Sequence, residues 1–156
     1  MLLRLALTAV LTSVFAAVWA ECPNGFVRHD SSCYKVFHIK GSWSEAKGYC
    51  NIFGAQLASI QSERESSFLS GLLGRDGLAA FNPGRFWLDA TDLISEGDWV
   101  WAGNEEHVDS TMAHWAPGEP SDTNHAEHCL ALDFTKGLMW TDEDCELKNN
   151  FICEFQ

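Results

Sequence analysis

The sequence predicts a single α+β domain, and three observations lead to that prediction. Two stretches in the first half carry apolar residues at helical spacing, each behind a serine that is followed three residues later by glutamate. The second half replaces this spacing with short aromatic and aliphatic runs between Gly, Pro, Asn and Asp. Six cysteines form an even set, which favours disulfides in an oxidising compartment.

The N-terminal segment has the composition of a secretory signal. Residues 1–20 carry one basic residue, Arg4, and an apolar run that ends at Val18 and Ala20, small side chains suited to cleavage. The remaining residues, 21–156, number 156 − 20 = 136, which suffices for one domain with a hydrophobic core. A membrane anchor is the alternative for residues 1–20, but only four residues precede the apolar run and no stalk follows it. Since no later stretch approaches the roughly 18 apolar residues of a span either, we expect a secreted protein without membrane insertion.

The net charge limits the partners. The whole chain has a formal charge of −12, and removal of Arg4 with the signal gives −12 − 1 = −13. Lys and Arg are spread singly, so a nucleic-acid partner is not expected, because phosphate binding needs a clustered basic face. The acidic excess suits cations, although an ordinary soluble surface has the same charge character.

The first elements are a hairpin and a helix. Residues 22–37 alternate turn residues with short apolar runs, and this pattern predicts a hairpin that brings two cysteines close enough to pair. Ser42 and Glu45 form a capping box for the following helix, and Gly54 supplies its end. Its apolar stripe consists of Trp43, Ala46, Cys50 and Phe53.

A short strand, a second helix and a series of strands follow. Residues 55–60 predict a buried strand or extended link, after which Ser62 and Glu65 cap a helix that Gly74 ends. The helix's buried stripe consists of Phe68, Leu69, Leu72 and Leu73. The strands are expected at 86–90, 98–103, 129–134, 138–140 and 150–155.

One long segment has no periodic pattern. It runs through residues 103–129 and holds Pro117, Gly118 and Pro120. So long a patternless stretch in a small domain is usually functional. The tryptophans outside the signal fit core patterns; for Trp115, beside this segment, sugar stacking is the alternative to a core position.

The order of these parts and of the cysteines resembles the C-type lectin-like domain over residues 21–156. The motifs that carry the resemblance are "FWLDA", "WAPGEPS", "LMWTDEDC" and "FICEF". The runs "EGDWVW", "EHCLAL" and "NNFICE" are most similar to small secreted lectins of molluscs, including perlucin-like proteins. The resemblance implies three disulfides of the long form, namely Cys22–Cys33, Cys50–Cys153 and Cys129–Cys145, and a cis peptide bond before Pro120.

The resemblance also implies a sugar-binding calcium site. In the family, its ligands come from a Glu-Pro-Asn motif, a glutamate two residues before the next cysteine, and a Trp-Asn-Asp motif. The matching positions in this chain are Glu119, Ser121, Glu127, Thr141 and Asp142. Two amides are thus replaced by hydroxyls, which are shorter and serve less well both as metal ligand and as sugar donor. We expect calcium binding to survive and sugar selectivity to shift.

A second calcium position matches Asp92, Glu96, Asp122 and His128. Here a histidine nitrogen replaces an oxygen, which calcium does not favour. The sequence therefore predicts a second site that is weaker than the first or does not hold calcium.

Enzymatic activity is not expected. His125 and His128 are three residues apart with the glutamate misplaced, so they do not form the zinc-protease pattern of two histidines four apart. No Gly-x-Ser-x-Gly motif occurs, and nothing joins a nucleophile to a base.

Three functions remain. The leading prediction is a secreted calcium-dependent lectin of innate immunity that binds microbial or cell-surface glycans. Glu119 precedes the proline, an order the family associates with mannose-type sugars, and weak single sites favour a homo-oligomer. The second is an acidic matrix protein that binds a mineral surface, and the third is an inactive lectin-like scaffold for protein partners.

Overall fold

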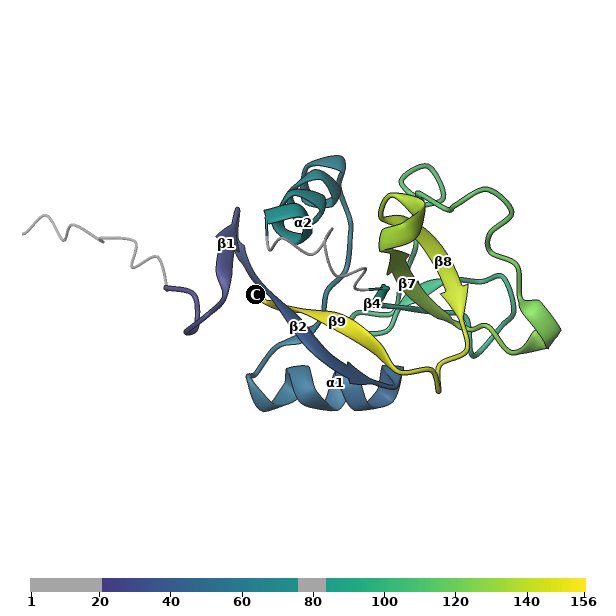
Figure 1. Ribbon diagram of the computed structural model, residues 1–156, viewed down its shortest axis with the longest axis horizontal. Helices are drawn as coiled ribbons and strands as arrows, with labels where there is room; N and C mark the ends of the chain where they lie inside the picture. The colour runs from purple at the N-terminus through teal and green to yellow at the C-terminus, as the bar shows by residue number, and fades with distance from the viewer. Residues whose placement is uncertain (1–20, 76–83) are drawn as a thin grey trace, which may run out of the picture.

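The computed structural model describes residues 21–75 and 84–156 and confirms the α+β prediction. Its described helices are α1 (Trp43–Ile52) and α2 (Glu63–Arg75). They lie on opposite sides of a mainly antiparallel sheet (Figure 1). The expected signal peptide, residues 1–20, lies outside the described residues. Within the described ranges, neither helix has the length and apolar character needed to cross a membrane.

The sheet brings the two ends of the domain together. Its described strands are β1 (Val27–His29), β2 (Ser32–Gly41), β3 (Gln56–Leu57), β4 (Arg85–Thr91), β5 (Val100–Trp101), β6 (Glu106–His107), β7 (Cys129–Asp133), β8 (Met139–Glu143) and β9 (Asn149–Phe155). Strand β9 pairs antiparallel with β2 and parallel with β4, so the last strand lies between the first part of the domain and the later strands. Strand β4 also pairs with β5 and β7, and β7 pairs with β8.

The start of α1 follows the predicted capping box. The Ser42 hydroxyl accepts a hydrogen bond from Glu45 N at 3.3 Å, while Glu45 Oε2 accepts one from Ser42 N at 2.8 Å. These contacts satisfy two backbone donors that a helix start leaves free. Beyond the helix, Gly54 has a φ of +67°, the left-handed conformation that the predicted stop requires.

The start of α2 confirms Ser62 as its cap, and its end corrects one prediction. Ser62 Oγ accepts a hydrogen bond from Glu65 N at 3.1 Å, but the Glu65 carboxylate accepts from Gln61 N at 2.8 Å and not from Ser62 N. Gly74 was predicted to end the helix, yet the helix continues to Arg75. Gly74 is exposed, so its missing side chain costs no packing and a single glycine does not stop the last turn.

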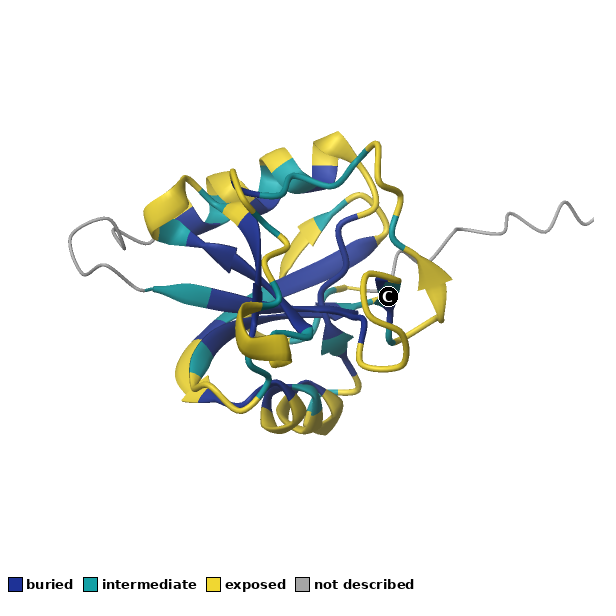
Figure 2. Cartoon of the chain, turned by 90° about the vertical axis from the view of Figure 1, so that its right-hand side faces the viewer, coloured by how far each residue is buried: buried dark blue, intermediate teal, exposed yellow. Residues whose placement is uncertain are grey.

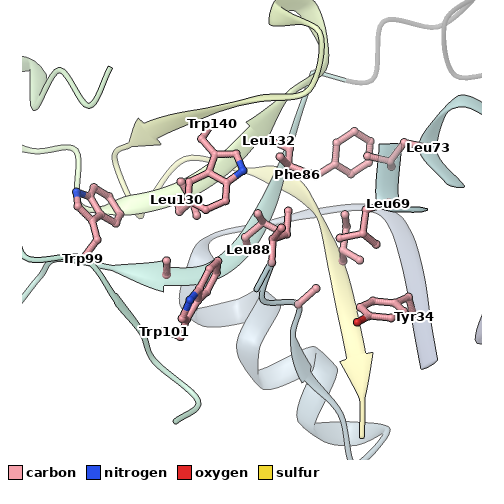
Figure 3. Packing of buried hydrophobic residues seen from close by; sticks show 14 residues of the cluster. Tyr34, Leu69, Leu73, Phe86, Leu88, Trp99, Trp101, Leu130, Leu132 and Trp140 are labelled. Atoms are coloured by element: carbon pink, nitrogen blue, oxygen red, sulfur yellow. The ribbon is translucent and has the colours of Figure 1, made fainter. Parts of the chain in front are cut away.

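The sheet is covered on both faces, which gives two buried clusters. Figure 2 shows buried strands between two helices whose outer faces are exposed. The cluster beside α2 contains Leu69 and Leu73, and Figure 3 shows Leu73 beside Phe86 of β4. The cluster beside α1 contains Trp43, Ala46 and Cys50, which are the predicted stripe residues of that helix. The apolar spacing of both helices therefore reports the faces that pack on the sheet.

All three disulfides expected from the resemblance are present. The Cys22–Cys33 bond closes the β1–β2 hairpin, and Cys50–Cys153 joins α1 to β9. Cys129–Cys145 joins the start of β7 to the chain beyond β8. The last bond therefore fixes the two-stranded unit that flanks the long segment.

The long segment is tied to the core at Trp115. This ring contacts Trp99 and Trp140 edge to face, with centroid distances of 5.0 and 5.7 Å. Ala116 N donates a hydrogen bond to Trp140 O at 2.8 Å. Trp115 accordingly packs against the core, as its sequence environment favoured, and it anchors the residues that follow.

Candidate functional site

The loop between Trp115 and β7 bends sharply at several residues, and its backbone angles are irregular there. The Glu119–Pro120 peptide bond is cis, as the resemblance implied. Asp122, Asn124 and His125 adopt positive φ values of 42°, 60° and 56°. Asp, Asn and His accept this left-handed region more readily than most other side chains. The polar residues of the loop are therefore explained in part by its backbone conformation, in addition to any role in binding a ligand.

Asp142 of β8 holds this loop in place. Its Oδ1 accepts a hydrogen bond from Ser121 N at 2.8 Å, and its Oδ2 accepts one from Asp122 N at 2.6 Å. Asp142 is only 2% exposed, and its strand partner across the β7–β8 ladder is Leu130. A nearly buried carboxylate on a rigid strand therefore fixes the loop immediately after the cis bond.

Glu127 closes the loop from its other end. Glu127 Oε2 accepts hydrogen bonds from Ser121 Oγ and from Thr123 N, both at 2.8 Å. The hydroxyl of Ser121 therefore contacts a carboxylate that the resemblance assigns to the same calcium site. The structure brings Ser121, Glu127 and Asp142 into one connected group.

Glu119 joins this group with one of its oxygens unsatisfied. Glu119 Oε1 accepts a hydrogen bond from Lys136 Nζ at 2.7 Å, and its side chain is 13% exposed. The other oxygen, Oε2, is buried and receives no hydrogen bond from the described residues. The Glu119 carboxyl lies next to that of Asp142, so this neighbour is a hydrogen-bond donor only when one of the two carboxyls carries a proton.

The two neighbouring carboxyls differ in acidity. Burial raises the pKa of Asp142 above its ordinary value, and the contact with Glu119 adds to the increase. Burial acts in the same direction on Glu119, but hydrogen bonds, first from Lys136, bring the pKa of Glu119 below its ordinary value. Two acidic groups therefore lie side by side with little access to water, and a bound cation would offset their negative charge.

Lys136 is a site residue that the sequence did not indicate. It lies in the short 3-10 turn Phe134–Lys136 after β7, and the residue it contacts, Glu119, is 17 residues away in the sequence. Its hydrogen bond to Glu119 raises the pKa of Lys136, so the ammonium group remains charged. A single lysine in a turn carries no signal of such a contact, because only the β7–β8 turn brings it there.

Thr141 occupies a different environment from the other predicted ligands. It lies on β8 opposite Ala131 and is completely buried, at 0% exposure. Its neighbour Asp142 reaches the loop backbone. Among the five predicted residues, Glu119, Ser121, Glu127 and Asp142 thus form the connected group, and Thr141 lies beside it in the strand.

Three of the four residues predicted for the second site also converge. One ligand atom each from Asp92, Glu96 and His128 lies within 4.8 Å of the others. His128 Nδ1 is 3.1 Å from Asp92 Oδ1 and 3.4 Å from Glu96 Oε2. The fourth residue, Asp122, lies outside this group of atoms and contacts His125 Nδ1 through Oδ2 at 2.8 Å.

The donor chemistry of the two groups differs. The loop group offers only oxygen atoms, which a hard cation such as calcium prefers, and one of them is a buried carboxylate oxygen without a donor. The loop residues therefore fit calcium. The second group includes an imidazole nitrogen, which fits calcium poorly.

A polar cavity lies at the other end of the molecule. It is bordered by β1, β2 and the start of α2, and contains Tyr34, Glu65 and Glu154. The Tyr34 hydroxyl contacts Glu65 closely, and Glu154 Oε2 accepts a hydrogen bond from Ser59 Oγ at 3.2 Å. These contacts satisfy the buried carboxylates from within the protein, so the cavity has a structural explanation.

Comparison with known proteins identifies the family. The family model for the lectin C-type domain matches residues 39–155. Perlucin from Haliotis laevigata is 40% identical over 134 residues, which cover 85% of this chain and 82% of that protein. The chain belongs to the C-type lectin domain family, as the sequence resemblance indicated.

Solved structures share the fold, and their names state different activities. The C-type lectin domain of murine dendritic cell inhibitory receptor 2, solved in complex with N-glycan, is 25% identical with a TM-score of 0.75, and the match covers 87% of this chain and 99% of that one. Herring type II antifreeze protein is 27% identical with a TM-score of 0.72, covering 86% and 98%. The fold therefore does not define the ligand, which depends on the site residues.

Proposed function

We propose that this protein is a secreted calcium-dependent lectin that binds glycans through the loop 119–128 and the adjoining strand β8. Its membership of the C-type lectin domain family supports carbohydrate binding as the general activity. The all-oxygen donor group supports calcium dependence. A lectin of this kind is a recognition protein and not an enzyme.

The observation that carries the proposal is the buried, unpartnered Oε2 of Glu119 beside the Asp142 carboxyl. A buried carboxylate oxygen without a donor is costly. A divalent cation at this point provides the positive partner that the described residues do not give to that oxygen. The Lys136 ammonium contacts only the other oxygen, Oε1.

Each residue of the loop group has a role in this proposal. Glu119, Glu127 and Asp142 hold the cation, and Asp142 also keeps the loop backbone in place. Bound calcium supplies coordination for neighbouring hydroxyls of a sugar. Glu119 and Glu127 accept hydrogen bonds from the same hydroxyls. Ser121, already bonded to Glu127, contributes its hydroxyl where the family motif has an amide.

The sugar class and the biological setting are proposed from the order of the proline motif and from the exposure of the loop. The Glu-first order at Glu119 favours mannose-type sugars. An exposed loop makes a shallow site of low monovalent affinity, so useful binding requires several copies in a homo-oligomer. We propose recognition of microbial or cell-surface glycans in innate immunity as the setting.

A glycan array tests the proposal. The purified protein is applied in calcium and in a chelator, together with Glu119→Ala and with the exposed control Glu146→Ala. We expect chelator-sensitive binding to mannose-containing glycans that Glu119→Ala abolishes and Glu146→Ala retains. Absence of chelator-sensitive binding to every glycan would falsify the lectin proposal.

A second candidate is an acidic matrix protein that binds a mineral such as calcium carbonate. The formal charge of −12 favours it, because adsorption to a mineral uses acids spread over the surface and needs no sugar site. In this case Glu119→Ala should leave adsorption to calcium carbonate nearly unchanged. If neither glycan nor mineral binds, and calorimetry detects no calcium binding at millimolar levels, a scaffold for protein partners is favoured.

A further inference from the structure

Asp92, Glu96 and His128 form a second group beside the loop group: His128 directly follows Glu127, whereas Asp92 and Glu96 come from the segment after β4. Asp92 is 1% exposed in its side chain, and its Oδ2 accepts a hydrogen bond from Gly97 N at 2.8 Å. Its Oδ1 points to His128 Nδ1 at 3.1 Å. One carboxylate oxygen is thus held by the backbone while the other faces the imidazole.

The backbone fixes His128 against the same segment. The carbonyl oxygen of His128 accepts a hydrogen bond from Thr91 Oγ1 at 2.6 Å and one from Asp92 N at 3.3 Å. His128 also immediately precedes Cys129, whose disulfide with Cys145 anchors the start of β7. The imidazole and the Asp92 carboxylate therefore have little freedom to move apart, which lowers the cost of ordering a metal site.

The distances suit a small tetrahedral ion. With metal–ligand bonds of about 2.1 Å, neighbouring ligands of a tetrahedral zinc ion lie about 3.4 Å apart. His128 Nδ1 lies 3.1 Å from Asp92 Oδ1 and 3.4 Å from Glu96 Oε2. Two of the three ligand pairs therefore lie close to the spacing that such an ion requires, and the third pair lies within 4.8 Å.

The charge and the donor types point to the same ions. Two carboxylates and one imidazole balance a divalent charge and leave a fourth position for water, as in zinc sites that have three protein ligands. Imidazole favours zinc and neighbouring transition metals, whereas calcium prefers oxygen ligands alone. Glu96 also lies near the negative charges of Asp92 and Asp122, a repulsion that a bound cation offsets.

We propose that Asp92, Glu96 and His128 bind zinc, or a divalent transition metal of similar ligand preference, in place of calcium. The site clamps the turn that follows β4 to the start of β7. It does not rest on the proposed sugar binding, because none of its three ligands belongs to the Glu119 group.

The test is isothermal titration calorimetry of the full secreted chain without a histidine tag, using zinc and calcium separately. We expect one zinc ion per chain, with affinity reduced on the order of 10- to 100-fold in His128→Ala and in Glu96→Gln, since even outer-shell partners contribute that much. His128→Asp restores an oxygen ligand, so zinc should weaken while calcium affinity rises. Cobalt(II) absorption of a tetrahedral centre should also disappear in His128→Ala.

The matched control is His107→Ala. His107 Nδ1 also contacts a carboxylate, Asp98 Oδ1 at 2.8 Å, but this exposed pair has no third ligand among residues 21–75 and 84–156. We expect this variant to bind zinc like the wild type. Equal zinc affinity in the wild type and His128→Ala, or equal losses in His107→Ala and His128→Ala, would overturn the proposal. Glycan binding in calcium is measured separately, so either proposal can fail alone.

Discussion

Ser121 is the residue at which this site differs most visibly from the family motif it resembles. Its hydroxyl donates to Glu127 Oε2 at 2.8 Å, and its backbone N donates to Asp142 Oδ1 at the same distance. Ser121 is therefore tied to both ends of the acidic group. A serine retains these contacts but offers a cation a shorter and weaker ligand than an amide carbonyl.

Replacement of Ser121 by asparagine tests that difference. Ser121→Asn should raise calcium affinity by roughly three- to tenfold, because the longer amide brings a carbonyl oxygen to the cation and its NH₂ still donates to Glu127. The position is exposed, so the larger side chain meets no core packing. Calorimetry with calcium measures the change.

The matched control places the same amide two residues away, in Thr123→Asn. Thr123 is also exposed, and it contacts Glu127 through its backbone N, which the substitution keeps. Calcium affinity should therefore remain at the wild-type value. An equal gain in calcium affinity in both variants would show that the effect of the amide does not depend on its position at residue 121.

The sequence indicated the acidic residues of the loop group but not the contacts that orient them. Glu119, Glu127 and Asp142 were found through motif positions. The hydrogen bonds of Asp142 to two loop N–H groups, and that of Lys136 to Glu119, depend on the β7–β8 turn and the cis bond. Such contacts join residues distant in sequence, and no local pattern encodes them.

At the scale of elements, local signals explain why the helices were predicted better than some strands. The Ser42–Glu45 capping box and the apolar stripe of α1 lie within one continuous segment, so interactions between residues close in sequence determine them. Strand β5 covers only Val100–Trp101 of the predicted 98–103, and β3 only Gln56–Leu57 of 55–60. Strand length depends on a partner strand elsewhere in the chain, which composition does not reveal.

The first turn of α2 contains an ionisable group whose burial affects stability. Burial raises the pKa of Glu65 above its ordinary value, although hydrogen bonds from Tyr34 and Gln61 oppose the increase. In the unfolded chain this group ionises near its ordinary pKa, about 4.3. As pH rises from there toward the higher folded pKa, unfolding releases a proton, so this group's contribution lowers the stability.

Glu65→Gln should therefore gain in free energy of unfolding relative to the wild type as pH rises above about 4.3. The side chain keeps its size but no longer titrates. Urea unfolding at several pH values between about 4 and 8 measures this difference. The exposed Glu146→Gln serves as control and should show a nearly constant difference. A constant difference for Glu65→Gln as well would show that its ionisation does not affect folding.

At the scale of the whole molecule, the disulfides connect segments that the sheet brings together. Cys50 and Cys153 are 103 residues apart, whereas Cys22 and Cys33 are 11 apart. A crosslink that closes a longer loop removes more conformational entropy from the unfolded chain. Cys50–Cys153 also lies in the cluster beside α1, where it joins the helix to the central strand β9.

Removal of each bond by double alanine substitution should separate these contributions. Loss of Cys50–Cys153 should cost about 4 to 5 kcal/mol of unfolding free energy, and loss of Cys22–Cys33 about 3 kcal/mol. Chemical unfolding of both variants beside the wild type measures the two costs. A larger cost for the hairpin bond would indicate that native contacts, and not loop length, determine the stabilisation.

Glu119, Glu127 and Asp142 are proposed to bind one calcium ion. Calcium titration of the wild type and of Glu119→Gln is the direct test of this binding. The affinity should lie at about 10⁻⁴ to 10⁻³ M, the range of extracellular modules. Glu119→Gln keeps the size of the side chain but removes the charge beside Asp142, so it should weaken this binding at least about tenfold. Glu146→Gln should bind like the wild type. The proposed calcium site would be contradicted by a wild type that shows no calcium binding at millimolar levels, or by unchanged calcium affinity in Glu119→Gln.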